Sequence, residues 1–192
     1  MTMVRGIYLP ADDREELVVR EFSGVDDYAR SVDGYIEAVD VPDLGVTIYV
    51  NEIGLLRRLP FNSRASFLWW YYEPAARESL LVRDAVIVGW PDADGESTDV
   101  PEAVLRLLTE PIEHGIVVRL DSAPGRDVHP MSRLAQIVLP LTAGDPSLLM
   151  SSARFASYFD ALTWAVVLEQ RWPEAEEVEV VPLVDGRPRL DP

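Results

Sequence analysis

The sequence predicts an α+β fold in which a mixed or antiparallel sheet carries three to four packed helices. Short β-branched runs bounded by turn residues indicate strands, and segments with helix-start signals or helical spacing of apolar residues indicate helices. The chain has 192 residues, of which 48% are hydrophobic, so it can bury a substantial core. This composition is typical of a folded globular protein.

The first fifty residues predict a hairpin, a short helix and two further strands. Ser23 or Asp26 is a suitable N-cap for the helix. In the strand after the helix, apolar side chains occur on both sides of the alternation, so we expect it to be buried on most of its two faces. The expected elements are the strands 6–10, 16–22, 34–41 and 46–52 and the helix 23–32.

The stretch VNEIGLLRRLPFNSRAS (50–66) combines a turn, two adjacent arginines, a proline and a helix start. The sequence Asn-Glu-Ile-Gly at 51–54 follows a strand and is typical of a β-turn. Pro60 cannot donate to a sheet ladder, so strand structure should stop near it. Asn62 is a good N-cap for the apolar run that follows, and Pro74 should end or kink that helix.

The second half of the chain predicts three strands and two helices, and residues 131–144 are ambiguous between the two types. Asp99 should cap the first of these helices. The second helix has apolar residues at spacings of three and four over about five turns. The expected elements are the strands 81–90, 115–122 and 177–184 and the helices 100–112 and 151–171.

The domain organisation follows from one polar segment. Residues 91–100 are acidic and rich in turn formers, so they are expected to link two parts. We expect an α+β domain at 1–90 and an α+β extension at 101–192, packed on the first as one globular unit.

The charge of the chain limits its partners. All 17 basic residues are arginine, and the formal net charge is −16, which should repel nucleic acid phosphates. Residues 1–43 and 91–113 carry net charges of −7 and −6, whereas residues 44–90 carry +1. The longest apolar runs are too short for a membrane span, and the N-terminus lacks a secretory signal, so we expect a cytoplasmic protein without direct nucleic acid or membrane binding.

Four short motifs occur in order: GYIEAV, VNEIG, LPFNSRA and LVRDAVIVG. Together they resemble the domain of unknown function 3846 family over residues 4–90. The resemblance implies a protein of actinobacterial phages, plasmids or other mobile elements, which would act in the cytoplasm of a host cell. Its pattern has glycine where this chain has Arg83, so the turn before Asp84 is expected to differ. The resemblance supplies a genomic setting and no catalytic residues.

The side chains needed for catalysis are scarce. The chain has no cysteine and no lysine, and its only histidines, His114 and His129, lie beside glycine or proline and are expected in exposed loops. Neither has a second ligand at helical or strand spacing. The sequence also lacks a glycine-rich phosphate loop. We therefore expect a protein that is not an enzyme and has no catalytic residues, metal site or cofactor.

Three groups of residues are candidates for binding. Arg57, Arg58, Asn62 and Arg64 could hold an anion at a helix N-terminus, or they could pair with nearby acids. Trp69 and Tyr72 could contact a partner, or they could lie in the core. Glu102, Glu110 and Glu113 could form an acidic docking surface, or they could be a solvated face.

These candidates support three hypotheses. The first is a non-enzymatic protein that binds a host protein, such as a defence or nucleic-acid-processing protein, through its acidic surface. The second is a binding protein, or sponge, for an anionic nucleotide-like small molecule. The third is a structural homo-oligomer.

Overall fold

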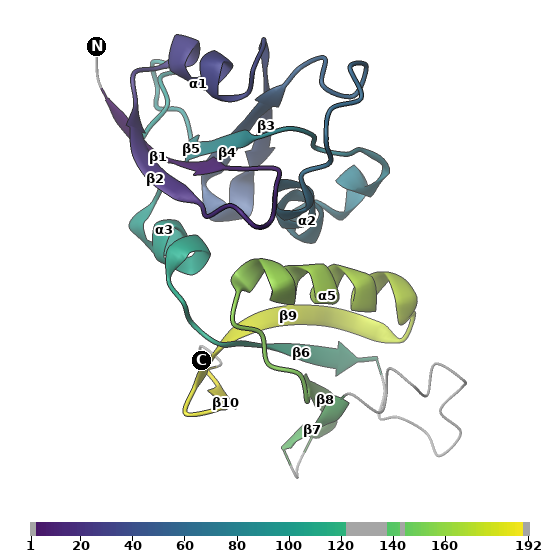
Figure 1. The fold of residues 1–192 in the computed structure, drawn as a ribbon. Helices are drawn as coiled ribbons and strands as arrows, with labels where there is room; N and C mark the ends of the chain where they lie inside the picture. The colour runs from purple at the N-terminus through teal and green to yellow at the C-terminus, as the bar shows by residue number, and fades with distance from the viewer. Residues whose placement is uncertain (1–2, 122–137, 143–144, 190–192) are drawn as a thin grey trace. The chain divides into compact units, whose positions relative to one another are not determined.

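The computed structural model describes residues 3–121, 138–142 and 145–189. It divides into two compact units, 1–110 and 111–192. Each unit contains a five-stranded sheet, and the strand pairs in both sheets are antiparallel. Figure 1 shows helices alongside both sheets, so the predicted α+β fold with an antiparallel sheet is confirmed. The expectation that both parts pack as one globular unit stays a prediction.

The sheet of the first unit has the strand order β2-β1-β5-β4-β3. Its strands are β1 (Val4–Leu9), β2 (Val18–Phe22), β3 (Ile36–Val41), β4 (Val46–Asn51) and β5 (Ala85–Gly89). The predicted hairpin is confirmed, because β1 pairs antiparallel with β2. β5 inserts between β1 and β4 and is buried along its whole length, so it forms the centre of the core.

The prediction that residues 34–41 form a strand buried on most of both faces is wrong. β3 is an edge strand that pairs only with β4 in the sheet order. Glu37, Ala38 and Asp40 are exposed, whereas Val39 and Val41 are buried. An edge position leaves one side of a strand without a neighbour, and charged residues suit such a position.

The helices of the first unit are α1, α2 and α3, with two 3₁₀ turns, η1 and η2. Their bounds are Val25–Ser31 for α1, Pro42–Leu44 for η1, Ser63–Tyr72 for α2, Pro74–Glu78 for η2 and Glu102–Thr109 for α3. The predicted N-cap Asn62 is confirmed, since its Oδ1 accepts a hydrogen bond from the Ala65 N–H at 3.0 Å.

The caps predicted for the other two helices are wrong. Gly24 occupies the N-cap position of α1, and the carboxylate of Asp27 accepts from the Ser23 N–H at 3.0 Å. Pro101 precedes α3, while Asp99 accepts a hydrogen bond from the Arg5 N–H at 2.7 Å. At α3 a backbone donor outside the helix thus takes the carboxylate of the predicted cap, whereas at α1 the N-cap residue is glycine and no side chain caps the helix.

Two layers of side chains fill the first unit. One cluster joins α1 to the sheet through Phe22, Tyr28, Val32, Val86 and Val88, with Val4 at its edge. Strand alternation places Ile7, Ile48 and Ile87 on the opposite face, and each is fully buried. Figure 1 shows α1 and α2 on opposite sides of this sheet.

Residues 91–100, the expected linker, belong to the first unit. Thr98 forms a bridge with Gly89 at the end of β5, and the Val100 N–H donates to the Arg5 carbonyl at 2.9 Å. The structure divides the chain after Glu110 instead. Polarity marked this segment as a turn, but its backbone hydrogen bonds attach the turn to the sheet.

The sheet of the second unit has the strand order β10-β9-β6-β8-β7. Its elements are β6 (His114–Leu120), β7 (Val138–Thr142), β8 (Asp145–Ser151), α5 (Tyr158–Arg171), β9 (Ala175–Val184) and β10 (Arg187–Pro188). α5 packs along β9 and β6 (Figure 1). None of the helices in the described residues is long and apolar enough to cross a membrane.

The helix predicted at 151–171 begins later than expected, at Tyr158. Ser151 ends β8 instead, and Phe155 forms a bridge with His114 in extended conformation. Pairing with β6 therefore takes the residues before Tyr158 out of the helix. Of the ambiguous stretch 131–144, residues 138–142 form β7, and the rest lies outside the described residues.

Candidate functional site

Asn62, a predicted anion-binding residue, is fully buried and bonded within the chain. Its Oδ1 caps α2, and its Nδ2 donates to the carbonyls of Leu9 at 3.2 Å and Arg83 at 2.9 Å. The amide thus joins the start of α2 to β1 and to the turn before β5. These bonds use both N–H groups and the oxygen, so the side chain acts as a structural bracket.

Arg64 is the second residue of α2 and holds the loop between β1 and β2. Its guanidinium donates to the carbonyls of Pro10 at 2.7 Å, Asp12 at 3.0 Å and Glu15 at 2.9 Å. The carboxylate of Asp13 lies 3.7 Å away, and burial lowers the pKa of Arg64. The protein itself therefore occupies both terminal nitrogens of the guanidinium, while the buried Nε makes no hydrogen bond to the described residues.

Arg57 and Arg58 lie in the loop before α2 and face the solvent. Arg57 donates to the Asp33 carbonyl at 3.1 Å and lies 3.8 Å from the Asp33 carboxylate. Arg58 is exposed and has a φ of 55°. The structure does not bring the four predicted ligand-binding residues together, because Asn62 and Arg64 point into the fold and the other two point outward.

The residues predicted to contact a partner are only partly available. Trp69 and Tyr72 are half-buried on α2, and the ring of Tyr72 contacts Tyr71 edge-on at 5.0 Å. Glu102 forms a 2.7 Å ion pair with Arg5. This bridge links β1 to α3, and it lowers the pKa of Glu102 through the Arg5 hydrogen bond.

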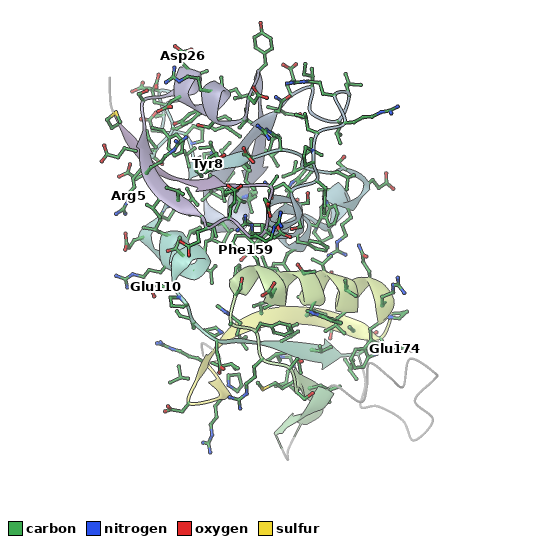
Figure 2. The ribbon with its side chains drawn as sticks, viewed as in Figure 1. Arg5, Tyr8, Asp26, Glu110, Phe159 and Glu174 are labelled. Atoms are coloured by element: carbon green, nitrogen blue, oxygen red, sulfur yellow. The ribbon has the colours of Figure 1, made fainter. Side chains whose placement is uncertain are left out.

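The other two predicted glutamates also lie near arginines. Glu110, directly after α3, is 3.9 Å from Arg106 on that helix, and Glu113, in the second unit, is 3.5 Å from Arg154. Figure 2 labels Arg5 and Glu110, whose side chains reach the solvent in the first unit. Ion pairs between exposed side chains contribute little to stability. A partner could therefore replace the arginines and bind these exposed carboxylates.

An exposed apolar surface lies between β4 and α2. Leu56 is 86% exposed, Leu55 54% and Ile53 40%, and Tyr35 in the adjoining turn is 77% exposed. The two turns lie side by side, because the Glu52 N–H donates to the Tyr35 carbonyl at 2.9 Å. We call residues 53–58 together with Tyr35 the loop surface. Leu55 and Leu56 stand directly before the two arginines in the sequence, but no local pattern predicts that they are exposed.

Internal hydrogen bonds order the backbone of the loop surface. The N–H groups of Arg57, Arg58 and Leu59 donate to carbonyls within the loop at 3.0 to 3.1 Å. Asn51 fixes the start of the loop by accepting from the Ile53 N–H and donating to the carbonyls of Val32 and Asp33. The apolar side chains are therefore presented from a folded turn.

The family model for a domain of unknown function, DUF3846, matches residues 4–113. The chain belongs to this family. The match extends past the resemblance predicted at 4–90 and includes α3. No curated protein and no solved structure matches the chain.

The DUF3846 motifs of this chain coincide with structural contacts. A side chain at Gly34 would overlap the Asn51 amide, and one at Gly89 would overlap the backbone of Asp99. Asp84 accepts hydrogen bonds from the Tyr8 hydroxyl at 2.7 Å and the Ala11 N–H at 3.0 Å. Burial, together with the bond to Asp84, raises the pKa of Tyr8 to about 12. These motif residues thus make close contacts within the first unit.

Arg83 stands where the resembled pattern has glycine, and the expectation that the turn differs from that of other family members stays a prediction. The φ of Arg83 is 67°, which is the left-handed conformation that glycine adopts without strain. Its N–H donates to the Pro60 carbonyl at 2.7 Å, and its own carbonyl accepts from Asn62. These bonds hold the arginine in the conformation that suits glycine.

The prediction that His114 lies in an exposed loop is wrong. It is the first residue of β6 and is 1% exposed, because backbone bonds to Phe155 pull it into the second unit. Its ring lies 5.2 Å from that of Tyr158, and its Nδ1 makes no hydrogen bond to the described residues. Burial lowers the pKa of His114. His129 lies outside the described residues.

Within residues 3–121, 138–142 and 145–189, no group of three or more acidic and histidine side chains could hold a metal ion.

Proposed function

We propose that this chain is a non-enzymatic binding protein that docks on another protein through the loop surface. The observation that carries the proposal is the exposure of Tyr35, Ile53, Leu55 and Leu56 on two adjoining turns joined by a hydrogen bond. Grouped apolar side chains in water commonly mark interaction sites. Because the backbone is already ordered by hydrogen bonds, binding would lose less conformational entropy than binding by a disordered segment.

The charges around the loop surface define the chemistry of the partner. Arg57 and Arg58 border the apolar side chains, and residues 44–90 carry a net charge of +1 in a chain of −16. A partner with an apolar recess bordered by carboxylates would complement this surface. The resemblance to proteins of phages and mobile elements makes a host protein in the cytoplasm the expected partner.

The experiment compares capture of host proteins by three forms of the full chain. Wild type and the control Leu80→Ser, which changes another exposed leucine, should retain the same partner. Leu55→Ser combined with Leu56→Ser should lose it while keeping the circular dichroism of the wild type. Capture that is equal in all three forms would contradict the proposal.

A second candidate is docking through acidic side chains, which the net charge of −16 favours. Glu102, Glu110 and Glu113 remain exposed beside their arginines, so they could meet a basic partner. Reversing these three charges should abolish a salt-sensitive interaction if this surface is used. A partner lost on charge reversal but retained by the leucine variant would assign function to the acidic surface.

The remaining hypotheses have narrower support. An anionic ligand would have to use Arg57 and Arg58, since Asn62 and Arg64 are bonded internally. Mass spectrometry of metabolites released from denatured protein tests this function. Self-association through the loop surface predicts a homo-oligomer in light scattering that Leu56→Ser dissociates.

A further inference from the structure

A recess of about 580 Å³ opens beside the start of α1. Its walls come from β1, β4, the first turn of α1 and the turn at residues 95–97. All of these parts belong to the first unit, so that unit alone forms the recess. Its volume lies in the range of sites that bind small molecules.

Two tyrosines line the recess. The rings of Tyr28 and Tyr49 stack with their centroids 4.7 Å apart and their planes at 15°. The Tyr49 hydroxyl lies 3.3 Å from the hydroxyl of Ser97. Val4 and Val25 add apolar wall. The recess therefore combines aromatic faces with hydroxyl groups.

The hydroxyl of Tyr28 is a second sign of a ligand. The residue is 1% exposed, and its oxygen makes no hydrogen bond of good geometry with the described residues. Burial raises the pKa of Tyr28, and Ser97 is close enough to offset part of that effect. A buried hydroxyl without a partner is destabilising, so a ligand atom that bonds to it would be favoured.

The charge of the recess selects against anions. The carboxylates of Asp26 and Glu96 line its exposed side, and the described lining residues include no arginine. Figure 2 shows Asp26 on α1 at the surface of the first unit. The first turn of α1 offers no compensating positive charge, because the Asp27 carboxylate already accepts from the Ser23 N–H at 3.0 Å.

The 95–97 turn is ordered without a ligand. The Asp92 carboxylate accepts hydrogen bonds from the N–H groups of Asp94 at 2.9 Å and Glu96 at 3.1 Å. The Asp92 N–H donates back to the Glu96 carbonyl at 2.9 Å. Glu96 and Ser97 are therefore attached to a fixed backbone.

We propose that this recess binds a small organic cation that carries an alkylammonium group. The ammonium N–H groups donate to Asp26, Glu96 and the hydroxyl of Tyr28. The alkyl chain lies against the stacked tyrosine rings, whose faces also attract a cation. The cation is either a free amine or the lysine side chain of a protein.

Calorimetric titration of the full chain tests the proposal. The probes are putrescine, as a free diamine, and Nα-acetyl-lysine amide, as a lysine side chain. Butyrate has a similar alkyl part and the opposite charge, so it should not bind. Tighter binding of putrescine identifies a metabolite site, and tighter binding of the lysine derivative identifies a contact with a protein. Absence of binding by both amines overturns the proposal.

Matched variants separate a site from general attraction to an acidic protein. Asp26→Asn with Glu96→Gln should weaken amine binding at least tenfold. Glu16→Gln with Glu78→Gln removes the same charge from exposed positions outside the lining and should leave affinity within twofold. Equal weakening in both double variants would show that only net charge matters.

Tyr28→Phe tests the hydroxyl itself. Since that oxygen has no hydrogen-bond partner among the described residues, the variant should fold as the wild type does. Amine affinity should fall about tenfold, the effect of one lost hydrogen bond to a charged group. Unchanged affinity would remove Tyr28 from the site and contradict the proposed geometry.

Discussion

The middle and the end of the stretch 50–66 make opposite use of their side chains. At the end, Asn62 and Arg64 direct their donors to carbonyls of β1, the following loop and the turn before β5. In the middle, Leu55 and Leu56 are apolar and yet lie in water. The polar residues hold the fold, and the apolar residues are free to bind.

This difference shows how a polar cluster differs from a binding site. Asn62 and Leu9 are 53 positions apart, and Arg64 and Pro10 are 54 apart, so no local pattern reveals their bonds. A donor is available to a ligand only if the fold leaves it unused. The availability of a side chain therefore has to be established from its tertiary contacts.

The largest effect is expected at Asn62. Asn62→Ala should lower the free energy of unfolding by about 3 kcal/mol, because it removes a helix cap and two buried hydrogen bonds. Urea unfolding measures the loss. Ser63→Ala removes only a hydroxyl bonded to exposed Asp13 and should cost no more than about 0.5 kcal/mol. Similar losses of unfolding free energy in both variants would show that the hydrogen bonds of Asn62 contribute no more to stability than the hydroxyl of Ser63.

A smaller loss is expected at Arg64. Arg64→Met keeps an unbranched apolar chain but removes three hydrogen bonds to carbonyls, which should cost about 2 kcal/mol. Hydrogen exchange should become faster in residues 11–16, which those bonds hold. Arg58→Met serves as the control and should leave exchange in that loop unchanged. If Arg64 served only to bind an anion, Arg64→Met would leave hydrogen exchange in residues 11–16 unchanged in the absence of a ligand.

Arg83→Gly should stabilise the protein by about 1 kcal/mol, since glycine adopts a φ of 67° without strain. Arg83→Ala removes the same side chain but keeps a Cβ, so it separates backbone strain from lost contacts. Chemical unfolding of both variants gives the comparison. An alanine variant as stable as the glycine variant would show that strain at this position is negligible.

His114 extends the comparison to the second unit, where a buried polar atom has no partner among the described residues. Burial lowers the pKa of His114 below its usual value of 6.5. Below pH 6.5 the histidine is therefore protonated more readily in the unfolded chain than in the folded chain. Stability from this group is complete above pH 6.5 and is lost as the pH falls towards the lower folded pKa. His114→Phe should reduce this pH dependence.

Hydrogen exchange of β6 and α5 at pH 7 and pH 5.5, corrected for intrinsic exchange rates, measures the change. The His129→Gln variant is the control, because it removes the other histidine. If His129→Gln flattens the pH dependence and His114→Phe does not, the buried ring is not its source.

The smallest effect on stability is expected at the loop surface. Leu55→Ser and Leu56→Ser should each change the free energy of unfolding by less than about 0.5 kcal/mol, because their side chains are largely exposed when folded. Thermal and urea unfolding test this expectation. A loss of several kcal/mol would show that these leucines contribute to a core and would weaken the proposed docking role.

Local sequence signals explain which elements were predicted well. The strands predicted at 6–10, 16–22 and 81–90 and the Asn62 cap depend on short-range patterns. The strands form at 4–9, 18–22 and 85–89, and Asn62 caps α2. Position in the sheet was harder to predict, because β5 enters between β1 and β4 from a distant part of the chain. That insertion leaves β3 at the edge and attaches residues 91–100 to the first unit.

The sequence alone determined the α+β class, most strand and helix positions, the acidic charge and membership of the DUF3846 family. These properties depend on composition, on patterns among neighbouring residues and, for the family, on the match over residues 4–113. Only the tertiary structure decided that Asn62 and Arg64 are bonded internally, that His114 is buried and that Leu55 and Leu56 are exposed. Burial and hydrogen bonding depend on residues far apart in the chain, which only the folded backbone brings together.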